Sequence, residues 1–386
     1  MHHDSGRADT QQLVALTASK STSNLALRWV TVFLPTLERA FSTTTGTITG
    51  ILGLAELGGL TTPLVGKTLD RGRHRLVFVI SLLLVTMSSV IALGGSIITF
   101  GVAMVVLIIG VSNLTVAGLA FIGDRVSYSS RGRAIGIFET SWALSLLVGA
   151  PILAFLIDRY GWRSAYIALA LLTGAAAIVT LRSLPTPEPH DSTSSAPMFG
   201  GLPRNAWPPL IASAGVAGAG ISIFVVTGAW LSDDYGLSVA GLGAIATGIG
   251  AAELASSSSV ALIADRLGIR RSVALGGLVL GVGLLIIALS GSSVAIALIG
   301  LLVLVVGFEY GFVSSLSLMS EAAPEARGTA LAVGNALGTI TRASLIVLSG
   351  QCYERFGVLG TVFVSASALG VALVALTIDR RRPVGR

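Results

Sequence analysis

Residues 66–75 read GKTLDRGRHR: a glycine, a short spacer, Asp-Arg, a second glycine and a basic cluster. This stretch separates two apolar runs, near 46–66 and 76–95. Each run is close to the roughly 20 apolar residues that a helix needs to span the hydrocarbon core of a bilayer. A short loop that carries four cations between two such runs is typical of the cytoplasmic side of a membrane protein.

The composition indicates that most of the chain's surface faces lipid. Hydrophobic residues make up 53% of the 386 positions and charged residues 11%, whereas an ordinary soluble domain has roughly 25% charged residues. The 47 glycines suit close contacts between helix backbones in a bilayer. The single Cys352 excludes an intrachain disulfide, and no histidine lies in an apolar run. Proton transfer within the membrane would therefore use carboxylates.

Twelve apolar runs are long enough to be transmembrane helices. The first, 17–38, is the weakest because it contains the polar segment 20–24. The others lie near 46–66, 76–95, 97–121, 133–156, 164–182, 208–231, 240–262, 273–291, 293–316, 328–350 and 358–378.

The basic residues are distributed unevenly between the two sides of these runs. With a cytoplasmic N-terminus, nineteen lysines and arginines fall in cytoplasmic loops and termini, Lys20 among them. The opposite side has four: Arg39, Arg159, Arg163 and Arg355. Because positive charge accumulates on the cytoplasmic side, both termini are predicted to be cytoplasmic. The N-terminal segment lacks the pattern of a cleavable signal peptide.

The middle of the chain is predicted to be a linker. Seven prolines and several serines lie between Ser183 and Pro209, a composition that cannot pack a core. We therefore predict an N-terminal six-helix bundle over 1–182, a cytoplasmic linker over 183–207 and a C-terminal six-helix bundle over 208–386.

The two predicted bundles repeat each other at an offset of about 196 residues. RGRA at 131–134 recurs as RGTA at 327–330, and DRYG at 158–161 recurs as ERFG at 354–357. Asp-Arg-Gly at 70–72 recurs at 265–268 with one inserted residue. A duplication in parallel orientation explains these matches, and it predicts a solute site where the two halves meet near the bilayer midplane.

These features resemble the major facilitator superfamily, particularly its efflux-permease-like members, over essentially the whole chain. The loop at 66–75 is similar to the best-known signature of that family, although it is one residue shorter before the second glycine. The counterpart at 261–271 keeps the spacing but has Ala261 in place of the first glycine. The resemblance implies an all-α membrane protein whose twelve transmembrane helices form two pseudo-symmetric six-helix bundles.

In that family the loop is a latch that ties the two halves together on the cytoplasmic side. Its interactions are individually weak at a wet surface, so they can break in every cycle. The same cations also hold the loop in the cytoplasm. The resemblance therefore implies gating roles for Gly66, Asp70, Arg71 and Arg75, and for the second-half residues Asp265 and Arg266.

Two departures from the family's drug–proton antiporters bear on the substrate. Those proteins carry an arginine in helix four a few residues before a glycine, and 101–110 contains none. They also carry Gly-Pro in helix five, where this chain has Gly149-Ala150-Pro151. Both differences weaken the resemblance to drug exporters.

Six charged residues lie deep in the predicted helices, where a charge costs at least a few kcal/mol and normally faces a cavity or a partner. They are Arg28, Glu56, Glu139, Glu253, Glu309 and Arg342. At 1.5 Å per residue, Arg28 lies about 15 Å from Glu38 at the outer end of the first helix. Glu139 is nearer the cytoplasmic side, and Asn113 occupies the position in the first half that corresponds to Glu309.

The family architecture implies that the first, fourth, seventh and tenth helices line the cavity and that the second approaches the eleventh. We assign substrate binding to Arg28, Asn113, Glu309, Tyr310 and Arg342. The candidates for proton coupling are Glu56, Glu139, Glu253 and Glu309. Arginine suits an anionic substrate because its planar fork donates two hydrogen bonds to a carboxylate. The alternative is that Glu56–Arg342 and Arg28–Glu309 are permanent ion pairs that hold the halves together.

The predicted function is secondary active transport of a small organic solute, with a preference for organic anions, by alternating access coupled to a proton or another ion. One alternative is the export of amphipathic drugs in exchange for protons; another is a membrane sensor or assembly factor that does not transport. An enzyme, a metal site and a cofactor are not expected, because the sequence has no nucleophile elbow, metal-spaced cluster or phosphate-binding loop. The expected partners are the solute, the coupling ion and the lipid bilayer, without nucleic acid, for a multi-pass monomer in the cytoplasmic (plasma) membrane.

Overall fold

The protein is α-helical throughout the part that the structure, a computed structural model, describes. That part comprises residues 10–185, 202–323 and 326–378, with the side chains at 128–129, 260–266 and 327–328 excepted. No strand occurs in these ranges, which confirms the prediction of an all-α protein. Ten segments within them are long and apolar enough to cross a membrane.

The helices follow one another with short connections. The first half contains α1 (Thr10–Val32), α2 (Leu34–Phe41), α3 (Thr45–Glu56), the 3₁₀ turn η1 (Leu57–Thr61), α4 (Thr62–Asp70), α5 (His74–Ala92), α6 (Ile97–Arg125), α7 (Tyr128–Leu144), the π-helical turn η2 (Ser145–Gly149), α8 (Ala150–Tyr160) and α9 (Trp162–Ser183). The second half contains η3 (Arg204–Ala206), α10 (Trp207–Phe224), α11 (Thr227–Tyr235), α12 (Val239–Leu267), α13 (Ile269–Ala288), α14 (Val294–Ser320) and α15 (Arg327–Ile378).

α15 contains a break that separates two of the predicted transmembrane runs. Gly357 has φ 60° and ψ −154°, which is outside the helical region. It lies between the predicted runs 328–350 and 358–378. α1 is not among the ten apolar segments, so the number twelve stays a prediction.

The first helix differs from its predicted range of 17–38. α1 begins at Thr10 and ends at Val32. Its end has a local cause, because Pro35, in the first turn of α2, has no N–H to donate to the carbonyl of Thr31. Lys20, which the charge distribution assigned to the cytoplasmic terminus, lies inside α1 and is buried. That assignment of Lys20 was wrong.

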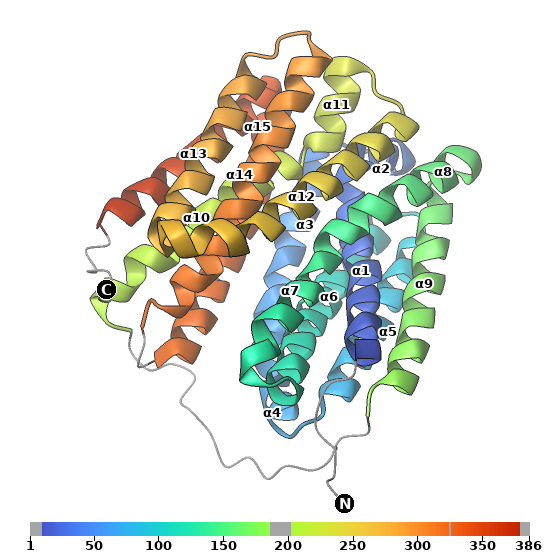
Figure 1. Cartoon of the computed structure of the whole chain (residues 1–386). Helices are drawn as coiled ribbons and strands as arrows, with labels where there is room; N and C mark the ends of the chain where they lie inside the picture. The colour runs from blue at the N-terminus through green and yellow to red at the C-terminus, as the bar shows by residue number, and fades with distance from the viewer. Residues whose placement is uncertain (1–9, 186–201, 324–325, 379–386) are drawn as a thin grey trace, which may run out of the picture. The chain divides into compact units, whose positions relative to one another are not determined.

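The helices form two compact units, coloured by residue number in Figure 1. Unit 1 comprises Met1–Thr43, Gly58–Ser194 and Ser238–Gly250, and unit 2 comprises Thr44–Leu57, Ser195–Leu237 and Ala251–Arg386. Each unit thus includes one short segment from the other half of the chain, namely α3 in unit 2 and the start of α12 in unit 1. The predicted division at 183–207 stays a prediction, and most of that linker lies outside the described residues.

The inclusion of α3 in unit 2 rests on close packing against α15. A Cβ at Gly53 would lie 2.5 Å from the side chain of Val347 and 2.7 Å from the carbonyl oxygen of Ala343. Only a glycine permits this approach of the two backbones. The transmembrane segment Thr45–Asp70 leaves unit 2 at η1, and a 3₁₀ stretch in the middle of a helix is a common place for a hinge.

Unit 1 encloses an aromatic and aliphatic core. Four helices contribute large side chains that are fully or almost fully buried: Leu16 of α1, Phe78 of α5, Phe121 of α6 and Phe138 of α7. A second aromatic contact joins α1 to α9, where the rings of Trp29 and Tyr166 meet edge to face at 4.8 Å between centroids. These contacts hold α1 between its neighbours and thereby set the direction of its polar face.

Glycines bring α13 and α14 together in unit 2. A Cβ at Gly283 would lie 2.5 Å from the backbone nitrogen of Leu304, and Gly276 lies against Gly307 and Gly311. Small residues at such contacts are expected in lipid, where dispersion contacts, rather than exclusion of water, hold helices together.

We expect Gly283→Leu to destabilise unit 2 by about 1–3 kcal/mol, because the new side chain would push α14 away. Gly370→Leu on α15 is the matched control, since no atom lies within 4 Å of its Cβ position. Thermal unfolding of both variants in detergent, followed by tryptophan fluorescence, measures the difference. Equal unfolding temperatures would contradict the packing argument.

The sequence repeat extends to the backbone. Gly72 and Gly268 have φ 71° and 82°, and Gly161 and Gly357 have φ 78° and 60°. Such positive values favour glycine. At Gly72, the amides of Gly72 and Arg73 donate to the carbonyls of Leu69 and Thr68 at 2.8 and 3.2 Å, which closes α4 with a Schellman motif. Both members of each repeated pair therefore adopt a positive φ where one helical segment gives way to the next.

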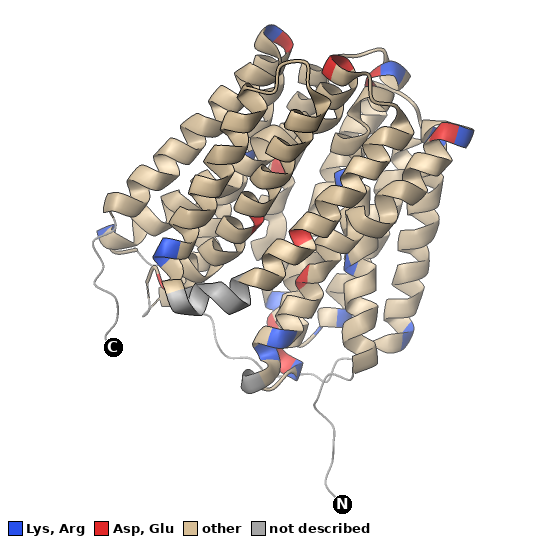
Figure 2. Cartoon of the chain, turned by 45° about the horizontal axis from the view of Figure 1, so that its top comes forward, with Lys and Arg blue, Asp and Glu red and all other residues tan. Residues whose placement is uncertain are grey.

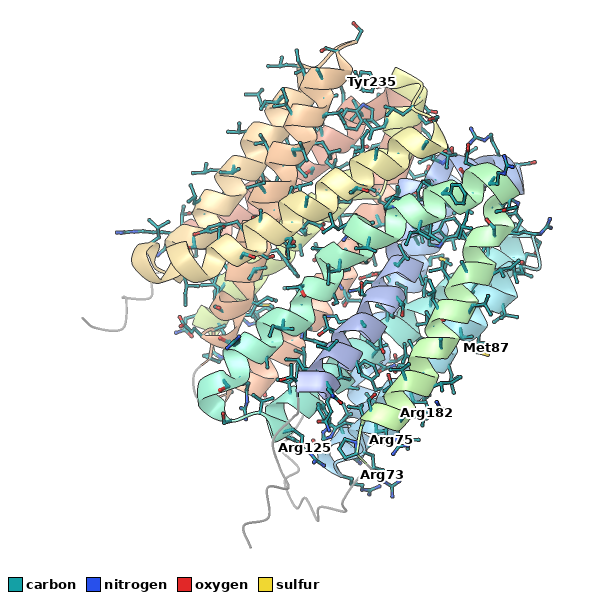
Figure 3. All side chains as sticks on the ribbon, turned by 45° about the vertical axis from the view of Figure 1, so that its right-hand side comes forward. Arg73, Arg75, Met87, Arg125, Arg182 and Tyr235 are labelled. Carbon is teal, nitrogen blue, oxygen red and sulfur yellow. The ribbon has the colours of Figure 1, made fainter. Side chains whose placement is uncertain are left out.

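Charged residues lie mainly toward the helix ends in each unit, as Figure 2 shows. In unit 1, the side chains of Arg73, Arg75, Arg125 and Arg182 gather at one end (Figure 3). This clustering agrees with the basic loops predicted from the sequence.

Candidate functional site

α1 carries three polar side chains on one face. Lys20, Asn24 and Arg28 are four residues apart, so they project from the same side of the helix. All three are buried. Because lipid offers no hydrogen bonds, each of these groups needs a partner within the protein.

α7 supplies those partners within unit 1. The Lys20 ammonium donates to Oε2 of Glu139 at 2.7 Å and lies 4.2 Å from the ring centroid of Phe138. Nδ2 of Asn24 donates to Oγ of Ser141 at 3.3 Å. The two ends of the ion pair differ in exposure, because the Lys20 side chain is 4% exposed and the Glu139 side chain 46%.

Arg28 is held against Trp142. Its Nη1 donates to the backbone carbonyl of Trp142 at 2.8 Å, and its guanidinium carbon lies 4.2 Å from the centroid of the indole ring. A guanidinium over an indole face gains a cation–π attraction. The same carbonyl accepts a hydrogen bond from Oγ of Ser145 at 2.6 Å. The arginine and a partly buried indole ring therefore form one polar and aromatic surface.

A distortion of the helix accompanies this contact. η2 begins three residues after Trp142 and winds as a π-helix, and Pro151 lies in the first turn of α8. Proline has no N–H for the carbonyl four residues earlier and crowds it, and π turns often occur at functional sites. Gly149, at the end of η2, lets α1 approach, since a Cβ there would lie 2.5 Å from Leu25.

Sequence reasoning identified Arg28 and Glu139 but missed Lys20 and Ser141. The spacing of Lys20, Asn24 and Arg28 was the available signal, because three polar residues at intervals of four form a stripe on a helix. The partner of Arg28 had no such signal, since it is a backbone carbonyl.

Asn113, predicted to bind substrate, lies buried on α6 in unit 1. Its Nδ2 donates to Oγ1 of Thr61 at 3.3 Å and to the carbonyl of Ile109 at 2.9 Å. Its Oδ1 is buried and has no hydrogen-bond partner among the described residues. Asn113 thus contacts η1 through Thr61.

In unit 2, the structure brings together Glu56 of α3 and Arg342 of α15. Nε of Arg342 donates to Oε1 of Glu56 at 2.7 Å, and its Nη2 lies 3.3 Å from Oγ1 of Thr339. The carboxylate side chain is 15% exposed and the arginine 31%. Both residues were predicted site residues, and their pairing was one of the two alternatives that the sequence left open.

A second polar contact joins α3 to α15 at the other end of α3. Oε1 of Glu354 accepts a hydrogen bond from the backbone amide of Gly46 at 2.7 Å. A carboxylate at a helix N-terminus is stabilised by the unpaired amides there. The interface of α3 and α15 therefore has a carboxylate bond at each end and glycine packing between them.

The other acidic candidates lie inside unit 2. Glu253 of α12 and Glu309 of α14 are buried. Tyr310 donates to Oγ of Ser272 on α13 at 3.3 Å, a contact between two neighbouring helices. Arg28 and Glu309 belong to different units, so their predicted pairing stays a prediction.

Aromatic rings surround the backbone next to Glu309. Phe308 lies 5.1 Å from Phe224 of α10, edge to face, and 5.6 Å from Phe312 in a stacked arrangement. Gly220 leaves room for the ring of Phe308.

The predicted latch residues lie around the turn between α4 and α5. Asp70 and Arg71 are exposed, and the space around Gly66 is open to 4 Å. His74 is buried and lies 3.0 Å from the carboxylate of Asp124 at the end of α6. Arg75 follows in the first turn of α5. The side chains of Asp265 and Arg266 lie outside the described residues.

Within the described ranges, no group of three or more His, Cys, Asp or Glu residues is arranged to hold a metal ion.

Two curated proteins from Bacillus subtilis (strain 168) are similar to part of the chain. NiaP, whose name assigns it provisionally to niacin/nicotinamide transport, is 31% identical over 133 residues, which is 34% of this chain and 33% of NiaP. The uncharacterised MFS-type transporter YwfA is 28% identical over 138 residues, which is 35% of this chain and 33% of YwfA. The match spans about a third of the length of both relatives.

Solved structures share the fold over nearly the whole chain. A bacterial homologue of the human lysosomal transporter Spinster, in an inward-facing and unoccupied conformation, superposes with a TM-score of 0.80 at 15% identity and covers 98% of this chain and 100% of its own. The human organic anion transporter MFSD10 (TETRAN) superposes with a TM-score of 0.72 at 16% identity, covering 96% and 99%. At these identities the likeness concerns the fold alone.

The family model described as Major Facilitator Superfamily matches the chain twice, over residues 17–344 and 210–386. The first match alone covers well over half of the chain. It agrees with the all-helical fold, the apolar segments and the repeated loop motif. The chain therefore belongs to the Major Facilitator Superfamily of transporters.

Proposed function

We propose that this transporter carries small organic anions, with aromatic monocarboxylates as the first candidates, by alternating access coupled to protons. The observation that supports this most directly is Arg28, a buried arginine on a membrane helix with its guanidinium over the ring of Trp142. A cation at membrane depth is expensive and normally marks a transport path or a partner.

The chemistry of this surface suits a planar acid. A guanidinium donates two parallel hydrogen bonds to a carboxylate, and an aromatic ring of the solute stacks favourably on an indole. Arg28 would hold the carboxylate and Trp142 the ring. Asn113, Glu309, Tyr310 and Arg342 remain the further residues proposed to contact the solute.

The relative NiaP supports the same class of solute. Its name refers to niacin, a pyridine carboxylate. Because the match covers a third of each chain, NiaP suggests which probe to test first and does not identify the substrate.

Coupling to protons is proposed to use carboxylates, since the described histidine, His74, lies at a helix end beside Asp124. Glu56, Glu139, Glu253 and Glu309 are the candidates. The latch is proposed to close the cytoplasmic side in each cycle. Its residues are Gly66, Asp70, Arg71 and Arg75 in the first half and Asp265 and Arg266 in the second.

The experiment that tests this function uses purified protein in proteoliposomes. Uptake of radiolabelled nicotinate and benzoate is measured with and without an inward proton gradient, and a pH-sensitive dye reports proton movement. We expect carboxylate uptake that is saturable and stimulated by the gradient. Uptake of tetraphenylphosphonium, a lipophilic cation, with no response to carboxylates would contradict the proposal.

That second outcome would favour the export of amphipathic cations. The aromatic rings of Phe224, Phe308 and Phe312 near Glu309 are the observation in its favour. Aromatic faces and a carboxylate are the groups that bind a lipophilic cation.

The transporter is further proposed to act as a monomer in the cytoplasmic membrane, with both termini in the cytoplasm. The four arginines gathered at one end of unit 1 (Figure 3) support that orientation.

A further inference from the structure

We propose that the Lys20–Glu139 pair is a second, proton-gated binding point for the anionic group of the solute, where one proton is taken up for each anion bound. This inference rests on the proposed transport of organic anions and adds the group that couples it to protons. Lys20 was not among the residues that the sequence suggested for the site.

The buried ammonium of Lys20 is stabilised by an anionic partner. Its ammonium is 2.7 Å from Glu139 and almost completely buried, and an unpaired charge in such a place is strongly destabilising. If Glu139 becomes neutral, an anion that takes its place keeps the buried ammonium of Lys20 paired. An anionic solute supplies that charge.

The side chain of Glu139 is not enclosed by protein. Nearly half of its side chain is exposed, and it lies nine residues, or about 14 Å, into the apolar segment that begins at Ser130. A carboxylate at such a depth normally faces a water-filled cavity. Protons can therefore enter and leave this carboxylate while Lys20 stays buried.

The Lys20–Glu139 pair differs from the Glu56–Arg342 pair in the chemistry of its cation and in the exposure of its carboxylate. The partner of Glu56 is a guanidinium, which remains charged and holds a carboxylate with a directional fork. Lys20 offers a compact ammonium that accepts one anion as readily as another. The Glu56 side chain is also less exposed, at 15%. Exchange of partners is therefore easier at Lys20.

Other charged groups lie on α1 and α7 and on the helices packed against them. Glu139 is the charged group whose field and hydrogen bond act on Lys20. The helices packed on α1 and α7 carry Glu38, Arg39, His74, Arg75, Asp124, Arg125, Asp158, Arg159, Arg163 and Arg182 toward their ends. α7 itself carries Arg131 and Arg133, and Arg133 is six residues, or about 9 Å, from Glu139 along the axis. On α1 itself, Arg28 is eight residues, or about 12 Å, from Lys20 along the axis.

The exchange is balanced in charge and protons. Glu139 takes a proton from water and releases Lys20, and the carboxylate of the solute then binds the ammonium. When the solute leaves, Glu139 returns its proton to water and pairs with Lys20 again. The site is neutral both when Glu139 pairs with Lys20 and when protonated Glu139 and the bound carboxylate replace that pair, so one proton moves with each monocarboxylate.

The test compares two kinds of nicotinate transport in proteoliposomes. One is accumulation driven by an inward gradient of one pH unit, and the other is exchange of labelled for unlabelled nicotinate at equal pH. A symporter that moves one proton with each anion accumulates about tenfold under that gradient. In Glu139→Gln, which mimics the protonated state, we expect accumulation to fall to about onefold while exchange stays within about threefold of wild type.

Two further variants complete the design. Thr140→Ala, next to Glu139 on α7, removes a bond to the carbonyl of Ile137 in the same helix without changing a charge, and it should behave as wild type in both assays. If Glu139→Gln does not fold, Lys20→Gln/Glu139→Gln takes its place, since it leaves no lone buried charge, and it should also lose gradient-driven accumulation.

The outcomes separate this inference from the proposed function. Gradient-driven accumulation by folded Glu139→Gln would overturn the inference, and so would equal loss of accumulation and exchange, which a purely structural ion pair predicts. Wild-type protein that neither accumulates nor exchanges nicotinate or benzoate would instead overturn the proposed function, and this inference with it.

Discussion

Replacement of Arg28 by glutamine is expected to lower nicotinate uptake at least about a hundredfold while the protein remains folded in the membrane. A charge-assisted bond to a carboxylate contributes about 1.5–3 kcal/mol, and a bidentate pair contributes two such bonds. Glutamine still has an amide to donate to the carbonyl of Trp142. The loss of transport would then come from the missing charge rather than from a missing contact with α7.

Two variants show whether the expected loss has this cause. Arg28→Lys keeps the charge but not the planar fork, so uptake should lie between that of wild type and that of Arg28→Gln. Trp142→Leu keeps the backbone carbonyl and removes the ring, so it should weaken nicotinate transport more than acetate transport. Initial uptake rates and the unfolding temperature are measured for each. Near-normal uptake by Arg28→Gln would remove Arg28 from the site.

The pair Glu56–Arg342 is expected to give the largest effect on stability. Removal of one member leaves a partly buried charge without its partner, which costs about 3–5 kcal/mol for a buried pair. Glu56→Gln and Arg342→Gln should each lower the unfolding temperature by several degrees. The double variant should lose less than the sum of the two, and less than either single variant, because it leaves no lone charge.

Glu354→Gln is the matched control for this pair, because it lies in the same interface of α3 and α15. Its partner is the amide of Gly46, and a glutamine oxygen accepts that bond too. Its effect should therefore be about 1 kcal/mol. Additive effects of Glu56→Gln and Arg342→Gln would show that the two side chains do not interact in solution.

Transport by the same variants decides between the two interpretations of the Glu56–Arg342 pair. A permanent ion pair predicts that the double variant recovers transport together with stability. A pair that exchanges partners during the cycle predicts recovery of stability without recovery of proton-coupled transport. Uptake and exchange of nicotinate by the double variant measure this directly.

Much of the architecture could be predicted from the sequence. The shortage of charge indicated lipid as the surrounding solvent, and the length of the apolar runs located most of the helices. The repeat of Asp-Arg-Gly, with an inserted residue in the second copy, predicted two related halves, and Gly72 and Gly268 both have a positive φ. These features can be predicted from the sequence because each depends on a short local segment.

The partners across helices depended on the tertiary structure. Lys20 and Glu139 are 119 residues apart, and the contact of Arg28 is with a backbone carbonyl, which every residue possesses. Which side chains meet is set by the rotation and depth of each helix, and these follow from where small residues permit close approach. In lipid, the buried and exposed faces of a helix are both apolar. The hydrophobic pattern therefore does not show which helix the polar face of α1 contacts.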